Sequence, residues 1–195
     1  MDKPIDISKL EHALQMLNEQ LILNDSPQTG IVVCGGSALI ALSLVPRTTQ
    51  DVDIVALMNE GVLVDAEHLP DYLLKAAEKV GRMMNLPEDW FNAGPATQFQ
   101  MGLPDGFQER LHPFIIGEKL TVYYIDRTDQ IYFKPFASAD GGGYHVTDLR
   151  QLAPTEDELI AAARWCMTQD VSPEFRMILK DMFTELGWQN VSARI

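Results

Sequence analysis

The sequence predicts a mixed α+β fold, in which a small mixed sheet is surrounded by helices and followed by a helical C-terminal part. Short β-rich runs alternate with helical patterns as far as about residue 125, whereas the last third of the chain carries helical periodicity alone. A length of 195 residues fits one domain with a substantial core. We therefore expect a single domain over residues 1–195, with its core at about 1–140 and its helical part at about 141–195.

The first predicted element is an amphipathic helix from Ser8 to about Leu23. Ser8 and Glu11 have the spacing of a capping box, which satisfies backbone N–H groups at a helix start. The apolar stripe of this helix comprises Ile7, Leu10, Leu14, Leu17 and Leu21. A polar segment follows, and Gly30–Cys34 is then predicted to form a short strand.

The middle of the chain alternates between helix and strand. Ser37–Leu44 has a helical composition and is stopped by Pro46. Asp51–Leu57 is the next predicted strand, and a helix is expected from about Asp71 to Met84. The region Asn85–Gly106 is rich in glycine, proline and polar residues and receives no assignment.

The next predicted unit is a β-hairpin. Arg110–Ile116 and Lys119–Ile125 are β-rich, and Gly117-Glu118 between them is suited to a tight turn. Such a hairpin would extend the small sheet.

Two helices are expected near the C-terminus. Thr155 and Glu158 form a second capping box, for a helix that reaches about Met167. Ser172-Pro173 is a cap followed by proline at the first helical position, and Gly187 ends that helix. Its predicted buried face comprises Phe175, Ile178, Leu179, Met182, Phe183 and Leu186.

Composition predicts a cytoplasmic protein without a membrane span. The longest apolar run, Ile31–Val45, is interrupted by glycine and is shorter than the roughly 20 residues that a spanning helix needs. The N-terminal residues do not have the pattern of a signal peptide. Cys34 and Cys166 lie in apolar segments without metal-type spacing, so we expect free core thiols.

The charge of the chain limits its partners. The formal net charge is −13, with 15 basic residues scattered among 28 acidic ones. Neutralising many phosphates requires clustered Lys and Arg, so binding to bulk nucleic acid is disfavoured. A triphosphate could still bind if metal ions bridged the like charges.

The segment Ile31–Leu57 carries two features suited to phosphate chemistry. A strand, the Gly35-Gly36 turn and a helix near Ser37 would present backbone N–H groups that favour an anion. A strand–helix turn that simply needs glycine gives the same pattern. Asp51 and Asp53 alternate along a strand and therefore share a face, with Val52, Ile54 and Ala56 pointing into the core.

The two aspartates would repel each other unless a cation lies between them. Magnesium is suited to this arrangement, because it takes one or two protein carboxylates together with substrate phosphates. The alternative is a strand end that emerges into solvent, with Asp51 capping the preceding turn.

This segment resembles the signature of the nucleotidyltransferase (polymerase-beta-like) superfamily. Gly36-Ser37 is followed, fourteen residues beyond Ser37, by Asp51-x-Asp53 with hydrophobic neighbours. The chain is most similar to small bacterial nucleotidyltransferases related to abortive-infection toxins, whose core begins with a Gly-Gly-x-Ala-Leu turn, here residues 35–39.

The resemblance implies a set of roles for these residues. The turn formed by Gly35, Gly36 and Ser37 would bind phosphates, as would Arg47. Asp51 and Asp53 would bind Mg²⁺ or Mn²⁺, which activates the acceptor and steadies a nucleoside triphosphate.

A second, weaker resemblance covers residues 129–165. It implies that Lys134 contacts the triphosphate and that Asp148, three residues after His145, is the third acid. Pro135 departs from the pattern, and we expect the helix to start near Lys134, because an interior helical proline costs about 3 kcal/mol. Asp126, at the end of the last predicted strand, is the competing candidate for the third acid.

The predicted activity is metal-dependent transfer of a nucleotidyl group from a nucleoside triphosphate to an unidentified acceptor. The alternative is a nucleotidyltransferase-like protein that binds a ligand or a protein partner and transfers nothing, because a fold does not determine a function.

Overall fold

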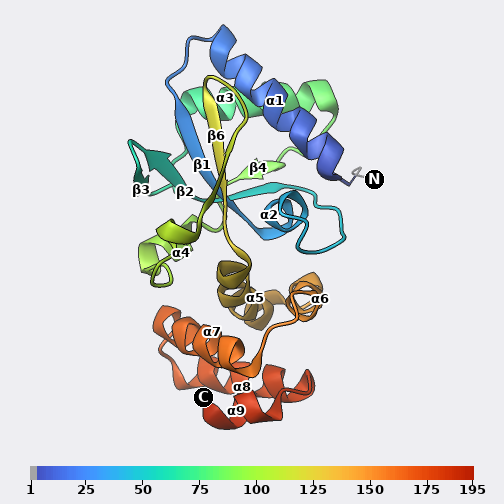
Figure 1. Ribbon diagram of the computed structural model, residues 1–195, viewed down its shortest axis with the longest axis vertical. Helices are drawn as coiled ribbons and strands as arrows, with labels where there is room; N and C mark the ends of the chain where they lie inside the picture. Colours follow the sequence, from blue (N-terminus) through green and yellow to red (C-terminus); the bar gives the residue numbers. More distant parts are fainter. Residues whose placement is uncertain (1–3) are drawn as a thin grey trace. The chain divides into compact units, whose positions relative to one another are not determined.

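The computed structural model describes residues 4–195, without the side chains of residues 140 and 141. The chain divides between Ile125 and Asp126 into two compact units. The first unit contains the sheet and the second is helical (Figure 1). The prediction of a mixed α+β fold with a helical C-terminal part is therefore confirmed. The helical part begins at Asp126, earlier than the residue near 141 that the sequence indicated.

The sheet of the first unit is mixed, with strand order β3-β2-β1-β6-β5 and with β4 pairing with β2. β1 runs antiparallel to β2 and parallel to β6. The strands are β1 (Thr29–Cys34), β2 (Val52–Asn59), β3 (Val62–Val64), β4 (Phe91–Asn92), β5 (His112–Ile115) and β6 (Leu120–Tyr124). The predicted hairpin is confirmed, since β5 and β6 pair antiparallel.

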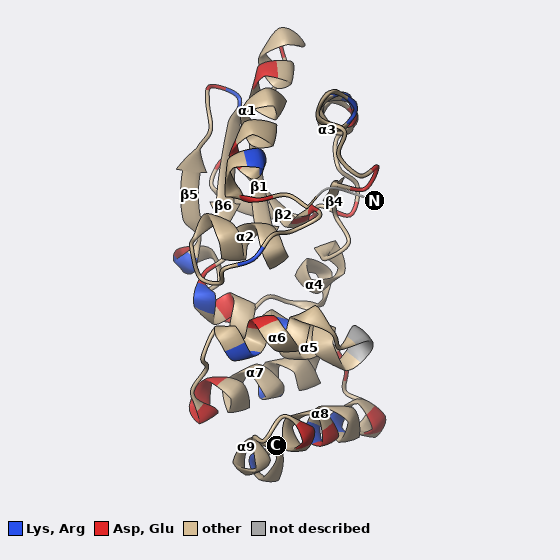
Figure 2. Cartoon of the chain, turned by 90° about the vertical axis from the view of Figure 1, so that its right-hand side faces the viewer, with Lys and Arg blue, Asp and Glu red and all other residues tan. Residues whose placement is uncertain are grey.

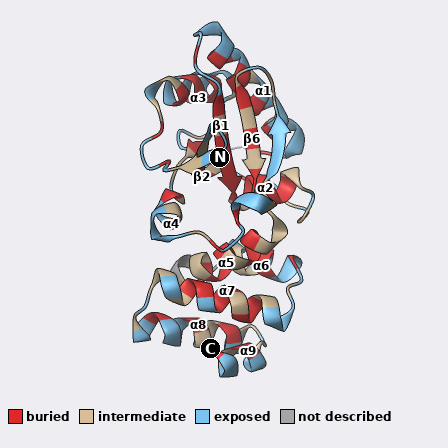
Figure 3. Cartoon of the chain, turned by 60° about the vertical axis from the view of Figure 1, so that its left-hand side comes forward, coloured by how far each residue is buried: buried red, intermediate tan, exposed pale blue. Residues whose placement is uncertain are grey.

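The central strand is buried and the edge strand is exposed. Every residue of β1 except Gly30 is buried, whereas all four residues of β5 are exposed (Figure 3). A central strand with both faces covered is expected to be a continuous apolar run. The run Ile31–Cys34 has this property, which explains why it could be recognised in the sequence.

A β-bulge interrupts the pairing of β1 with β2. Val32 lies opposite Ala56, but the next residue, Val33, lies opposite Ile54. Because cross-strand partners share a face, Ile54 and Ala56 point to opposite faces of the sheet. The expectation that Val52, Ile54 and Ala56 share one face was therefore wrong, because β2 contains an extra residue at the bulge.

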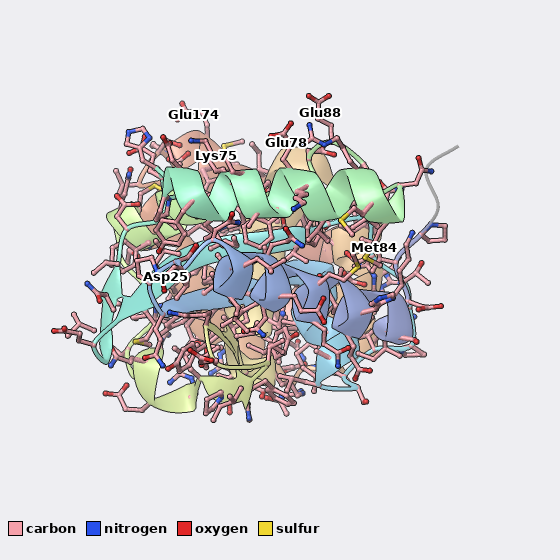
Figure 4. All side chains as sticks on the ribbon, turned by 90° about the horizontal axis from the view of Figure 1, so that it is seen from above. Asp25, Lys75, Glu78, Met84, Glu88 and Glu174 are labelled. Atoms are coloured by element: carbon pink, nitrogen blue, oxygen red, sulfur yellow. The ribbon has the colours of Figure 1, made fainter. Side chains whose placement is uncertain are left out.

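Two helices cover one face of the sheet. The helices of the first unit are α1 (Ile7–Leu23), α2 (Gly35–Ala41), α3 (Asp71–Met84) and α4 (Ala96–Met101), with a 3-10 turn, η1, at Gln108–Arg110. α1 packs beside α3, and Lys75 and Glu78 project outward from α3 (Figure 4). The Thr29 hydroxyl of β1 lies 3.1 Å from the Tyr72 hydroxyl of α3, which identifies the covered face.

The first helix begins one residue earlier than predicted. Asp6, and not Ser8, is the N-cap, because its Oδ1 accepts a hydrogen bond of 2.8 Å from the Lys9 N–H. Ile5 pairs with Thr49 through two backbone hydrogen bonds, which fixes the chain direction just before the helix. The apolar stripe is buried except at Ile7, which is 42% exposed.

The second unit consists of helices α5 (Arg127–Gly141), α6 (Tyr144–Gln151), α7 (Glu156–Gln169), α8 (Pro173–Glu185) and α9 (Gln189–Arg194). The predicted capping box of Thr155 and Glu158 is confirmed at the start of α7. Ser172 caps α8 as predicted, since its Oγ accepts a 3.2 Å hydrogen bond from the Phe175 N–H. Cys34 and Cys166 are buried and form no disulfide, and burial raises the pKa of the Cys166 thiol to about 12.

Pro135 lies inside α5, so the expectation that this helix starts near Lys134 was wrong. The helix begins after Asp126, whose Oδ1 accepts a 2.8 Å hydrogen bond from the Thr128 N–H. The proline costs about 3 kcal/mol, while burying each large aromatic side chain contributes about 1.5–3 kcal/mol. The Phe133 ring stacks on Trp165 with centroids 5.4 Å apart, so tertiary packing offsets the break.

No helix within residues 4–195 has both the length and the apolarity required to cross a membrane.

Trp90 connects α3 to the start of β2. Its ring is 2% exposed, and its Nε1–H donates a 3.1 Å hydrogen bond to the Ala77 carbonyl. Its own carbonyl accepts a 2.6 Å hydrogen bond from the Val52 N–H. A Cβ atom on Gly81 would lie 2.8 Å from Nε1, so the ring fits against this position only because the residue is glycine.

We expect Gly81→Ala to destabilise the protein, although alanine is the better helix former. Alanine gains about 1 kcal/mol of helix propensity, but overpacking a filled core costs about 1–3 kcal/mol. Urea denaturation should show a net loss of about 1 kcal/mol. In a Trp90→Phe background the loss should shrink, because the Nε1 atom is gone; equal losses in both backgrounds would contradict the packing explanation.

Candidate active site

The Gly35-Gly36-Ser37 turn joins β1 to α2 and lies against the second aspartate. Gly35 has a φ of +64°, and a Cβ atom built there would lie 2.5 Å from Asp53 Oδ2. The backbone conformation therefore favours glycine, and a larger residue would also have to displace the Asp53 carboxylate. α2 begins at Gly35, so the N–H groups of Gly36 and Ser37 belong to its first turn, outside the intrahelical ladder.

Ser37 is completely buried, and its hydroxyl donates a 2.5 Å hydrogen bond to the backbone carbonyl of Asp51. This hydrogen bond therefore connects α2 to Asp51, the residue that precedes β2. This contact gives the hydroxyl a positioning role. For Ser37, the backbone N–H is the group that could face a phosphate.

Arg47 and Thr49 border the same turn. A Cβ atom on Gly36 would lie 2.5 Å from Thr49 Oγ1 and 3.4 Å from Arg47 Nη2. The Arg47 Nε–H donates a 2.8 Å hydrogen bond to the Thr48 carbonyl, which orients the side chain. The structure therefore brings the predicted cation, Arg47, to the glycine turn.

Asp51 and Asp53 are half-buried, while Val52 between them is completely buried. Asp53 lies opposite Cys34 of β1, on the face of the sheet away from Thr29 and α3. Asp51 alternates with it, so the predicted shared face is consistent with the described backbone.

The environment of Asp51 disfavours its ionised form. Burial raises the pKa of this carboxyl above its usual value, and the negative charge of Asp89 raises it further. A 3.1 Å hydrogen bond from Thr49 Oγ1 and the charge of Arg47 oppose the shift. A half-buried carboxylate near other acids is suited to binding a cation, which would supply the missing positive charge.

Asp89 and Asn92 were missed by sequence reasoning. They lie in the region 85–106, where the only strand-like piece is the two-residue β4, too short to show periodicity. Asn92 pairs with Asp53 in parallel register, and its Nδ2 donates a 3.2 Å hydrogen bond to Asp53 Oδ1. Asn92 also lines a cavity of about 400 Å³ with residues of the 67–74 segment, including His68.

The donor set fits a hard divalent cation that shares its coordination with a substrate. Magnesium uses one or two protein carboxylates and completes its shell with water and phosphate oxygens. Asp51 and Asp53 supply two carboxylates near a glycine turn. Among the described residues, no group of three or more His, Cys, Asp or Glu side chains is arranged to hold a metal ion.

Lys134 and Asp148 form an ion pair inside the second unit. Lys134 Nζ lies 2.7 Å from Asp148 Oδ2, and each side chain is 4% exposed. The spacing that the resemblance singled out therefore brings the two residues together, from α5 and α6. Their proposed separate roles, at the triphosphate and as the third acid, would have to be compatible with this contact.

The other two candidates of the C-terminal resemblance have structural neighbours. Asp126 caps α5 through the Thr128 N–H. His145 lies in α6, where its ring centroid is 4.1 Å from that of Tyr144. The expectation that Lys134 and Asp148 reach Asp51 and Asp53 joins residues of two units and stays a prediction.

Comparison with known proteins identifies a family. A family model described as a nucleotidyltransferase of unknown function (DUF6036) matches residues 8–142. The matched range includes the glycine turn, the acid pair and Lys134, and it ends before Asp148. No match was found among curated proteins or among solved structures.

Gly35→Ala should weaken metal binding beyond its effect on stability. A non-glycine residue in the left-handed region costs about 1–2 kcal/mol, and the new Cβ would also displace the Asp53 carboxylate. Gly61→Ala is a matched control, because Gly61 has a φ of +81° and open space around a Cβ. Thermal melts should show that both variants are less stable than the unaltered protein. Mn²⁺ titration should show weaker binding in Gly35→Ala alone. Equal Mn²⁺ affinities in the two variants would contradict a role for the close approach of Gly35 to Asp53.

Breaking the buried ion pair on one side should be strongly destabilising. We expect Lys134→Met or Asp148→Asn to cost about 3–5 kcal/mol, because a buried charge loses its partner. The double variant Lys134→Met/Asp148→Leu should recover most of the loss in urea denaturation. If this double variant is stable and has lost triphosphate binding, the implied catalytic roles are supported; if it binds normally, the pair is structural.

Proposed function

This chain belongs to the nucleotidyltransferases of unknown function (DUF6036), and on that premise we propose metal-dependent nucleotidyl transfer from a nucleoside triphosphate to an acceptor. In this proposal Asp51 and Asp53 bind Mg²⁺ or Mn²⁺. Gly35, Gly36 and the backbone of Ser37 hold phosphates, and Arg47 offsets their charge.

One observation supports this proposal most directly. The carboxylate of Asp53 lies so close to Gly35 that a Cβ atom there would be 2.5 Å from Oδ2. A phosphate over the glycine turn would therefore lie next to the acid pair, and only a bridging cation makes these like charges compatible. Arg47, at the same turn, adds a fixed positive charge in a chain whose formal net charge is −13.

The proposed reaction is a substitution at the α-phosphorus of the triphosphate. A nucleophilic atom of the acceptor forms a bond to phosphorus, the bond to the bridging oxygen breaks, and pyrophosphate leaves. A bound divalent ion supplies charge stabilisation for the attacking and leaving groups. The backbone N–H groups of α2 and the guanidinium of Arg47 orient the phosphates, so positioning and electrostatics provide most of the acceleration.

Lys134 and Asp148 have supporting roles in the proposal. Lys134 would add a compact positive charge and Asp148 a third carboxylate. Their 2.7 Å contact favours a joint action, in which Asp148 orients Lys134, over two independent roles.

Bulk nucleic acid is a poor acceptor for such a protein. Figure 2 shows Lys and Arg on several elements, interspersed with Asp and Glu. Tight binding to nucleic acid requires clustered Lys and Arg, which neutralise many phosphates. We therefore propose a smaller acceptor or a protein surface instead.

The second candidate function is binding of a ligand or partner without transfer. Fold alone does not separate the two functions. Metal-dependent triphosphate binding does, because a binding module that does not use the site would be indifferent both to the metal ion and to the loss of Asp51.

Asp51→Asn should abolish the proposed function without harming the fold. Mn²⁺-dependent binding of a labelled triphosphate should be lost, and transfer to components of a cell extract should fall by about 100-fold or more, the scale of losing one group that stabilises transition-state charge. Asp105→Asn, at an exposed aspartate of the same unit, should behave like the unaltered protein.

The same variant tests the raised pKa of Asp51. In chelator at neutral pH, Asp51→Asn should melt at the same temperature or higher, since the fold disfavours the ionised carboxyl. The difference should shrink as the pH falls through the folded-state pKa, because the unaltered protein then takes up a proton. A much less stable variant would show instead that Asp51 is a structural hydrogen-bonding residue.

A further inference from the structure

Asn92 contacts a carboxylate of the proposed metal site, and no family resemblance pointed to it. We propose that Asn92 is a positioning residue, which holds Asp53 in the orientation needed to bind a divalent cation. This inference rests on the proposed function, because it assigns Asn92 a role towards the same metal ion.

The amide group of Asn92 is held on both sides. The backbone N–H of Gly94 donates a 2.9 Å hydrogen bond to Asn92 Oδ1. Because a backbone N–H can only donate, this contact identifies the oxygen side of the amide. The nitrogen side then faces Asp53 Oδ1 at 3.2 Å and the carbonyl of Asp89 at 3.4 Å. Both contacts of Nδ2 are with acceptors, so the orientation is chemically consistent.

The backbone places this amide beside Asp53. β4 pairs with β2 in parallel register, with Val52 opposite Phe91 and Asp53 opposite Asn92. The residue before β4, Trp90, accepts a 2.6 Å hydrogen bond from the Val52 N–H and is buried against α3. Sites supported by paired strands are more precise than sites on free loops.

Each carboxylate oxygen of Asp53 has a neighbour in the first unit. Oδ1 accepts from Asn92, and Oδ2 lies against Gly35, where there is no room for a Cβ. Residues that hydrogen-bond to a metal ligand fix its orientation, and their loss typically reduces metal affinity by about 10–100-fold. A neutral donor is also the suitable residue here, because a third carboxylate beside Asp51 and Asp53 would add to their repulsion.

The direct test is Mn²⁺ affinity, measured by titration with and without a non-hydrolysable triphosphate. Asn92→Ala should bind Mn²⁺ about 10-fold more weakly. Asn92→Asp keeps the acceptor for Gly94 but replaces the donor with a charge, so it should bind at least as weakly as Asn92→Ala. Melts in chelator should show that both variants are folded.

Gln100→Ala is the matched control. The Gln100 amide also donates to carboxylates, at 2.9 Å to Asp65 Oδ2 and 2.7 Å to Glu67 Oε2, but it does not contact Asp53 in these hydrogen bonds. This variant should retain the Mn²⁺ affinity of the unaltered protein.

The outcomes distinguish this inference from the proposed function. Normal Mn²⁺ affinity in Asn92→Ala, with binding in the unaltered protein, overturns the role of Asn92 and leaves the function intact. Tighter binding in Asn92→Asp also overturns it, because residue 92 would then occupy a ligand position. Absence of Mn²⁺ binding in the unaltered protein overturns both proposals.

Discussion

The candidate site of the first unit depends on one constraint, which is that two half-buried carboxylates are held at the start of β2. Asp51 and Asp53 flank the completely buried Val52, so neither can move away without disturbing the sheet. The surrounding groups reduce the cost of holding them there. Thr49 donates to one carboxylate and Asn92 to the other, while the positive charge of Arg47 opposes the raised pKa of Asp51. The remaining deficit of positive charge is what a metal ion would supply.

In the second unit, two buried charges balance each other. Lys134 and Asp148 are buried charges of opposite sign in direct contact, and they need no external ion. A buried pair of this kind contributes little net stability but is costly to break on one side. In the proposed function a metal ion completes the acid pair of the first unit, whereas the two charges of the second unit pair with each other.

Sequence reasoning succeeded where a local pattern determines the structure. The continuous apolar run of β1, the helix Asp71–Met84 and the capping box of Thr155 were all recognisable from residue type and spacing. The turn Glu60-Gly61, where both residues have positive φ, was missed together with the short strand β3 that it introduces. Pro135 was misinterpreted because its local cost is offset by aromatic packing from α7, which no local pattern reveals.

The candidate site was predictable to the same extent. Strand periodicity could relate Asp51 to Asp53, and the family resemblance linked them to Gly35 in the same segment. Asn92 reaches Asp53 across 39 residues through a two-residue strand, and only tertiary pairing creates that contact. The hydroxyl of Ser37 has a backbone partner that its sequence position did not indicate.

The bulge between β1 and β2 has a consequence for how this protein can tolerate insertions and deletions. Side chains alternate along a strand, so removing the extra residue would turn everything before it to the other face. Asp51 and Asp53 would then point towards the face that α1 and α3 cover, and Ile54 would point towards the opposite face. Deleting Val55 would thus turn two carboxylates towards the helix-covered face of the sheet, although no other residue changes. The length of β2 is under stricter constraint than the identity of most of its residues.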